Sequence, residues 1–214
     1  KYRNMVSTGD LVWVSETSDV TKNLVQWVPN PDGKLQILYH PEHTAKYLDI
    51  GGVDSYYQED SKTSDSKGAC IIYRRFSGTD MPGELPVCMY NDRPYTKEEF
   101  YDTCLKMAVY YNSELLVEYT DELFFKYFEN RNALKYLKKR PKAADSPWSR
   151  VSNRFGVHMK SYQKNMITEL LDDYVRKNCD SIMFLDILDD LSVYGFKNTD
   201  LAMAFGLCLS LIHI

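Results

Sequence analysis

The sequence predicts an α/β protein in which a mixed sheet is flanked by helices, and three observations lead to that prediction. Two apolar β-like runs, at about 47–53 and 69–76, are separated by a polar stretch without periodicity. A capping box at 96–99 then opens a segment of helical periodicity. A short apolar run at 115–117 follows the helix. Antiparallel strands that lead through a crossover helix into a parallel strand are an α/β pattern.

The remaining elements follow from similar patterns. We expect a third strand at about 87–90, helices at about 121–129, 161–177 and 181–194, and a last helix that opens at 198–199. Thr120 is the expected cap of the helix at 121–129. His40 and His43 flank a proline-containing turn without a helical or strand scaffold, which favours a surface loop over a metal site.

The composition is that of an ordinary globular protein. Hydrophobic residues make up 44% of the 214 residues and charged residues 26%, enough for one sizeable core. Neither a run of eighteen apolar residues nor a cationic leader occurs, so the sequence indicates no membrane partner. The five cysteines are widely spaced and form no Cys-x-x-Cys pair, which favours reduced, buried thiols in a cytosolic compartment.

The net charge of −4 conceals one basic segment. From Arg131 to Lys164 the sequence has ten Lys or Arg and one acid, Asp145, so this segment carries +9 and the rest of the chain −13. A basic segment in an acidic protein suggests a polyanion bound by one face. A solvated, flexible loop is the alternative of equal weight.

Both ends of the sequence suggest a fragment of a longer gene. Residues 1–46 contain short β-like runs and a Pro-Asn-Pro-Asp-Gly turn, which predicts an extended arm. The closing residues 209–214 resemble an in-frame translation of a common transposase sequencing adapter. We therefore expect an arm at 1–46, a folded domain at 47–208 and an artefactual tail at 209–214.

Three carboxylates are predicted to meet at one edge of the sheet. A crossover helix can place the strand that ends at Glu118 parallel to the strand that ends at Asp54, and parallel neighbours bring their C-terminal ends together. Asp200 lies in the first turn of the last helix, where the helix dipole favours its ionised form. Glu114 lies about 13 Å further back along its strand. Asp49 is as poorly placed, so neither can share the site.

Clustered carboxylates need compensating cations. Ligands that are all oxygens favour a hard divalent ion, Mg²⁺ or Mn²⁺. Two such ions could activate water and stabilise the leaving oxygen of a phosphodiester, while the basic segment holds the phosphate backbone. The pattern therefore predicts a nuclease with Asp54, Glu118 and Asp200 as catalytic residues and metal ligands.

Each acid also has an ordinary structural interpretation. Asp54 can form a turn, Glu118 can be a surface residue at a strand end, and Asp200 can be a helix-start residue. The order strand-Asp, strand-Glu, helix-Asp favours a ribonuclease H-like site over that interpretation. The alternative acids are Asp121 and Glu122, which could assist from outside the ligand shell, and Asp189 and Asp190, which we expect on a solvated helix face.

Four motifs occur in one order along the chain: Gly51-Gly52-Val53-Asp54-Ser55-Tyr56, Asn91-Asp92-Arg93-Pro94, the stretch from Tyr110 to Glu118, and the stretch from Asn198 to Ala204. Together they resemble the nuclease domain of the large terminase subunit of tailed double-stranded DNA bacteriophages. The resemblance covers about 47–208, and residues 11–46 resemble the arm that leads out of the ATPase domain. No P-loop motif is present, so the ATPase half is expected to lie upstream of this chain.

The resemblance implies a ribonuclease H-like fold and an endonuclease that cuts concatemeric viral DNA during genome packaging. It carries Asp54, Glu118 and Asp200 over as ligands of two Mg²⁺ or Mn²⁺ ions, with Asp54 touching both. It also implies double-stranded DNA, the viral portal and the small terminase subunit as partners. The implied location is the host cytoplasm, at the procapsid, without a membrane.

Six basic residues are expected to contact DNA phosphates: Lys138, Lys139, Arg140, Lys142, Arg150 and Arg154. Two other functions stay open at this point. The first is another ribonuclease H-like nuclease, of the resolvase or transposase type, which a P-loop ATPase directly upstream would argue against. The second is a non-catalytic domain that docks on DNA or on the portal, for which no metal binding at the acids is expected.

Overall fold

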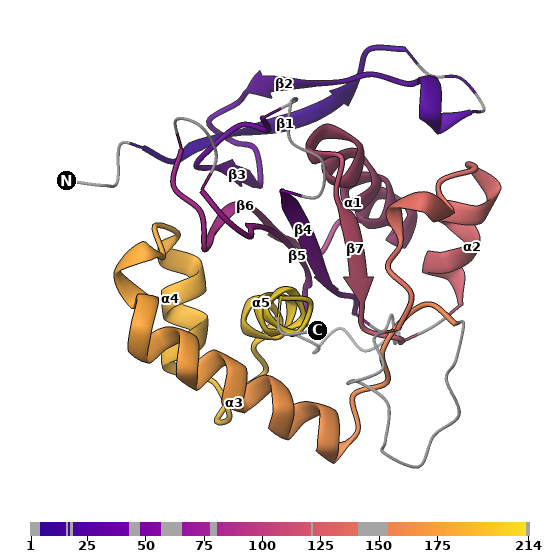
Figure 1. Cartoon of the computed structure of the whole chain (residues 1–214). Coiled ribbons are helices and arrows are strands. Elements are labelled where there is room, and N and C mark those ends of the chain that lie inside the picture. Colours follow the sequence, from indigo (N-terminus) through magenta and orange to yellow (C-terminus); the bar gives the residue numbers. More distant parts are fainter. Residues whose placement is uncertain are drawn as a thin grey trace.

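A mixed sheet of seven strands, in the order β2-β1-β3-β6-β5-β4-β7, forms the centre of the described part of the molecule (Figure 1). The computed structural model describes residues 5–15, 17, 19–42, 48–56, 66–77, 81–120, 122–140 and 154–212. The strands are β1 (Ser7–Trp13), β2 (Val25–Pro29), β3 (Leu35–Ile37), β4 (Asp49–Asp54), β5 (Gly68–Arg74), β6 (Leu85–Asp92) and β7 (Glu114–Val117). The predicted class, an α/β fold with a mixed sheet, is confirmed.

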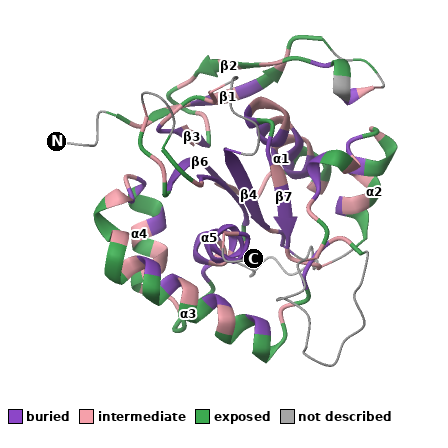
Figure 2. Ribbon diagram, viewed as in Figure 1, coloured by how far each residue is buried: buried purple, intermediate pink, exposed green. Residues whose placement is uncertain are grey.

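Helices cover both faces of this sheet. They are α1 (Lys97–Tyr111), α2 (Leu123–Asn130), α3 (Ser161–Asn178), α4 (Leu185–Ser192) and α5 (Asp200–Ser210), with short 3₁₀ helices η1 (Val20–Lys22), η2 (Leu134–Tyr136) and η4 (Cys179–Ser181). Helix α1 packs on one face and α5 on the other, and α3 and α4 pack against α5 (Figure 1). Strands β4 and β7 and helix α5 are therefore buried almost throughout (Figure 2).

The central meander and crossover form as the sequence predicts. Strand β5 is antiparallel to β4 and β6, and β7 is parallel to β4 with Leu116 opposite Gly52. Helix α1 makes the crossover from β6 to β7. Thr96 accepts a hydrogen bond from the backbone N–H of Glu99 at 3.2 Å, and Asn112 ends the helix with a left-handed φ of 48°.

The first 46 residues add strands to the same sheet. Strand β1 pairs with β2 and β3, and β3 pairs with β6, all antiparallel. The strands before and after residue 46 therefore belong to one sheet. The division of the chain at this residue and its connection to an upstream ATPase domain stay predictions.

Two predicted helix starts are wrong. Helix α4 begins at Leu185 rather than 181, because the buried side chains of Ile182 and Phe184 are placed by an extended segment after η4. Helix α2 begins at Leu123 and receives no side-chain cap. The hydroxyl of Thr120 instead hydrogen-bonds the hydroxyl of Ser55.

Several smaller predictions have outcomes in the described residues. Four cysteines are buried as predicted, but Cys179 is exposed, because it lies in η4 on the surface. His40 lies in a loop, where its Nδ1 is 2.9 Å from the hydroxyl of Tyr110, and His43 lies outside the described residues. In the predicted tail, Leu209 and Ser210 complete α5 and are buried. No described helix is both long and apolar enough to cross a bilayer.

Candidate active site

The ends of β4 and β7 bring two acids together. The backbone N–H of Glu118 donates to the carbonyl of Val53 at 2.8 Å, which extends the parallel pairing to the residue before Asp54. The charge of Glu118 acts strongly on the carboxyl group of Asp54, so the two side chains lie close together. Burial raises the pKa of Asp54 well above its usual range, and the nearby Glu118, Asp200 and Asp190 raise it further.

A glycine at the centre of β4 positions the third acid. A Cβ on Gly52 would lie 2.0 Å from the carbonyl oxygen of Ala204, so only glycine lets α5 lie this close to the strand. Asp200 lies one helical turn before Ala204, on the same helix face, and Asp54 lies two residues after Gly52, on the same strand face. The close packing of α5 therefore brings Asp200 towards Asp54.

The carboxylate of Asp200 has two hydrogen-bond donors. Its Oδ2 accepts from the backbone N–H of Lys67 at 2.8 Å, and its Oδ1 accepts from Nδ2 of Asn198 at 2.8 Å. Burial raises the pKa of Asp200, the Lys67 N–H opposes this shift, and Asp190 raises the pKa further. Asp200 therefore faces the Asp54 and Glu118 pair while these donors hold its carboxylate.

All three predicted acids line one pocket of about 420 Å³. Its other polar lining residues are Ser55, Ser66, Thr120, Lys164, Thr168, Lys197, Asn198 and Thr199. Within the described ranges, no three acids, histidines or cysteines are gathered closely enough to hold a metal ion as they stand. The site is an acidic pair with a third acid across the same cavity.

The donor set fits a hard divalent cation. Asp54 and Glu118 offer only oxygens, and burial together with the charge of Glu118 raises the pKa of Asp54. A cation bound there would supply the compensating charge for the ionised carboxylates. Asp200 would complete the set by exchanging its hydrogen bond from Asn198 or Lys67 for the cation.

Asp190, which the sequence offered only as an alternative acid, lies close to Asp54 and Asp200, and the prediction of a solvated helix face is wrong for it. It is half-buried near the end of α4, and its Oδ2 accepts from the backbone N–H of Ala202 at 2.9 Å. Asp190 thus caps α5 from another helix. Burial raises its pKa. Asp189 is exposed, as expected. No local pattern marks a cap that comes from ten residues upstream.

Of the two acids past the end of β7, Glu122 is exposed and lies 3.6 Å from the ammonium group of Lys126. Asp121 lies outside the described residues.

Four of the six predicted DNA-contacting residues lie in the described part of the chain, and one of them, Lys138, lies apart from the other three. The ammonium group of Lys138 lies 2.7 Å from Glu114, at the opposite end of β7 from Glu118. Arg140 donates from Nε to the carbonyl of Gly156 at 2.7 Å. Lys139 and Arg154 are exposed. Lys142 and Arg150 lie outside the described residues.

A basic and aromatic surface adjoins the acidic pair. Val157 bridges to Glu118, and the exposed ring of His158 lies 4.4 Å from the ring of Tyr119. Burial lowers the pKa of His158, and the charges of Arg140, Lys160 and Arg154 lower it further, which places these cations near the ring. This part of the predicted basic segment therefore lies beside the acids.

The sheet order, the crossover and the acids at the ends of β4 and β7 together define a ribonuclease H-like α/β fold. The sequence matches no protein-family model and no curated protein. Among solved structures, the chain is similar to the large terminase nuclease from thermophilic phage G20c.

Three structures of that nuclease carry different metals. With bound zinc, the TM-score is 0.59 at 10% identity, over 98% of this chain and 96% of that chain. With bound magnesium, the TM-score is 0.57 at 10% identity, over 98% and 95%. With bound cobalt, it is 0.58 at 12% identity, over 85% and 89%. The predicted resemblance to the terminase nuclease is thus confirmed at the level of the fold.

Proposed function

We propose that this chain is a metal-dependent endonuclease that cuts double-stranded DNA, and that it is the nuclease part of a large terminase subunit. The observation that carries the proposal is the half-buried Asp54 and Glu118 pair, which faces Asp200 across one pocket. The likeness of the fold to a nuclease with bound magnesium supports it. In this proposal the substrate is concatemeric viral DNA in the host cytoplasm, and the partners are the portal and the small terminase subunit.

Asp54, Glu118 and Asp200 would hold two Mg²⁺ or Mn²⁺ ions, with Asp54 touching both. Such a pair of ions, when bound, supplies an activated water and stabilises the leaving oxygen. Gly52 and Asp190 position Asp200 by fixing α5 against β4.

The cations around the pocket would orient the DNA. Lys164 and Lys197 lie in the pocket lining, where an ammonium group can bind a phosphate oxygen. Arg140, Arg154 and Lys160 lie on the adjacent surface beside His158 and would bind the backbone of the approaching strand. Lys138 is expected to contribute less than these residues because Glu114 already pairs with it.

The test is nicking of supercoiled plasmid in Mn²⁺. Asp54→Ala should reduce nicking to the level measured with excess EDTA, because it removes the acid shared by both proposed ions. Asp32→Asn, in the exposed turn between β2 and β3, is the control and should cut like the wild type. Equal cutting by Asp54→Ala and the wild type would refute the proposal.

A non-catalytic docking domain is the second candidate. It is favoured by one observation: the described acids do not form a ready metal cage, since Asp200 is held by Lys67 and Asn198. This alternative predicts DNA or portal binding without any Mn²⁺-dependent nicking.

A further inference from the structure

A second polar pocket lies at the opposite ends of strands β4 and β7 from the Asp54 and Glu118 pair. It has a volume of about 330 Å³ and is formed where β4 and β7 begin and β5 ends. Its lining residues are Asp49, Ile50, Arg75, Asn112, Ser113, Glu114, Lys135, Tyr136, Lys138 and Leu211. Since β4 has six residues, the two pockets are separated by about 17 Å of strand.

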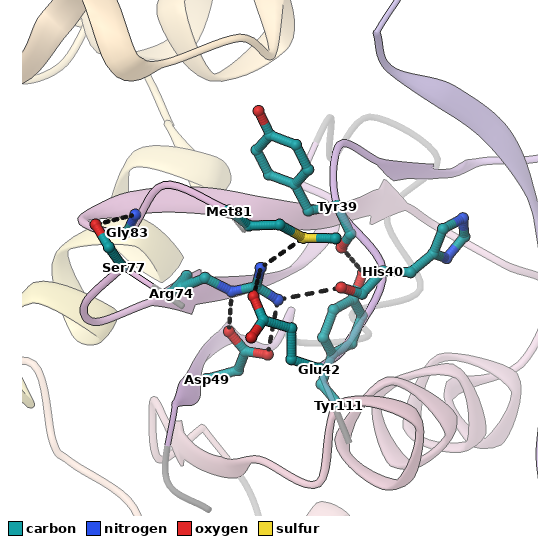
Figure 3. Close-up of polar contacts among 9 residues, drawn as sticks. All are labelled: Tyr39, His40, Glu42, Asp49, Arg74, Ser77, Met81, Gly83 and Tyr111. Carbon is teal, nitrogen blue, oxygen red and sulfur yellow. Dashed lines mark hydrogen bonds and ion pairs between the residues drawn. The ribbon is translucent and has the colours of Figure 1, made fainter. Parts of the chain in front are cut away.

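The acids of this pocket are already paired with cations. Arg74 is fully buried and donates from Nε to Oδ1 of Asp49 at 2.9 Å and from a terminal nitrogen to Oδ2 at 3.3 Å (Figure 3). The carbonyl of His40 accepts a hydrogen bond from the same terminal nitrogen, and Glu42 lies 3.5 Å from the other one. Glu114 lies 2.7 Å from the ammonium group of Lys138. Neither Asp49 nor Glu114 therefore leaves an uncompensated negative charge in the pocket.

Two cations remain after this pairing. Arg75 is half-buried in the pocket wall. The ammonium group of Lys135 lies 4.7 Å from the centre of the Tyr136 ring, which holds this exposed side chain at the pocket. The lining is therefore net positive although the whole chain has a net charge of −4.

Two buried donors of the pocket are unsatisfied. Ser113 is 1% exposed, and its hydroxyl has no hydrogen-bond partner among the described residues. The same holds for Nε of Arg75. Leaving such groups unpaired is unfavourable, and both residues belong to the wall of one cavity. A change of side-chain rotamer would turn these donors toward an acceptor bound in the pocket.

We propose that this pocket binds a small oxyanion, with a phosphate group as the ligand class that its donors fit best. A guanidinium binds phosphate oxygens in a planar fork. The hydroxyl of Ser113 donates to a third position, and Lys135 supplies the second positive charge for a dianion. Ile50, Tyr136 and Leu211 form an apolar side of the pocket, which suits a phosphorylated small molecule. The site goes beyond the proposed nuclease function and does not depend on it.

The test is calorimetric titration of the whole chain in EDTA, so that the acidic pocket binds no metal. Inorganic phosphate and AMP should bind saturably. Arg75→Gln should weaken phosphate binding by about tenfold or more, and Ser113→Ala by about three- to tenfold. Arg176→Gln is the matched control, because Arg176 is exposed on α3 and pairs with Asp172, and it should bind phosphate like the wild type.

A second readout separates binding from folding. In the absence of ligand, Ser113→Ala should melt at or above the wild-type temperature, because it removes a buried hydroxyl without a partner. Absence of saturable phosphate binding, or binding that Arg75→Gln leaves unchanged, would overturn the proposal. Arg75-dependent binding of a DNA hairpin without any binding of phosphate or AMP would overturn it as well. None of these outcomes bears on plasmid nicking.

Discussion

Asp49 and Asp54 stand at the two ends of the same strand, and they differ in what surrounds them. Asp49 is buried against Arg74, with two hydrogen bonds to its guanidinium (Figure 3). Asp54 is half-buried beside Glu118, with Asp200 and Asp190 near by. Burial raises the pKa of both, but Arg74 opposes the shift at Asp49, whereas every neighbouring acid adds to it at Asp54. The Asp49 end of β4 is stabilised by an ion pair. At the Asp54 end, neighbouring acids repel one another, and a bound cation would relieve that repulsion.

The largest expected effect is at the paired end. Arg74→Met should lower the free energy of unfolding by about 3–5 kcal/mol, because it leaves buried Asp49 and Glu42 without their cation. Urea denaturation measures this loss. Arg176→Met removes the cation of an exposed pair and should lower the free energy of unfolding far less than Arg74→Met does. An equal loss of unfolding free energy in the two variants would show that the buried Arg74 ion pairs contribute no more to stability than an exposed pair.

The next effect is at the contact between α5 and β4. Gly52→Ala should lower the free energy of unfolding by about 1–3 kcal/mol, because its Cβ would meet the backbone of Ala204. The variant should also bind Mn²⁺ more weakly than the wild type, since Asp200 moves with α5. Thermal unfolding and Mn²⁺ titration measure the two effects. Unchanged Mn²⁺ affinity would mean that Asp200 does not contribute to Mn²⁺ binding.

The smallest effect is at the acidic end, and it has the opposite sign. Without metal, Asp54→Asn should raise the free energy of unfolding at neutral pH by about 0.5–2 kcal/mol, because it removes a buried charge that faces other acids. The folded pKa of Asp54 lies above the value of 3.8 for a free side chain. The folded state therefore binds more protons between these two values, and stability falls as pH rises through this window.

This fall in stability should be smaller in Asp54→Asn than in the wild type. Denaturation of both proteins in EDTA over a pH series above 3.8 measures the difference. If the free energy of unfolding fell equally with pH in both proteins, the charge of Asp54 would not destabilise the folded state.

The sequence predicted those parts of the site that depend on regular elements. Asp54 and Glu118 follow strands whose parallel pairing is set by the crossover through α1, so their meeting could be predicted from strand ends and helix periodicity. Asp200 is harder to predict, because its place depends on the packing of α5 over Gly52. The sequence shows the Gly51-Gly52 pair, but it does not show which helix packs against these glycines.

Contacts between distant side chains could not be predicted. Asp190 caps α5 from α4, and Arg74 collects Asp49, Glu42 and the carbonyl of His40 from separate segments. The ion pair of Lys138 with Glu114 likewise joins residues 24 positions apart. Charge counting therefore overstated how many cations of the basic segment can face DNA together.

The measurement that tests the central claim most directly is titration of Mn²⁺ into the metal-free chain by calorimetry, in two buffers of different ionisation enthalpy. We predict saturable binding that releases protons, because the raised pKa of Asp54 favours its protonated form and a bound cation favours its carboxylate. The release should diminish as the pH is raised. Asp54→Asn should abolish this binding, and Asp32→Asn should leave it unchanged. Absence of saturable binding, or binding that survives Asp54→Asn, would contradict the account.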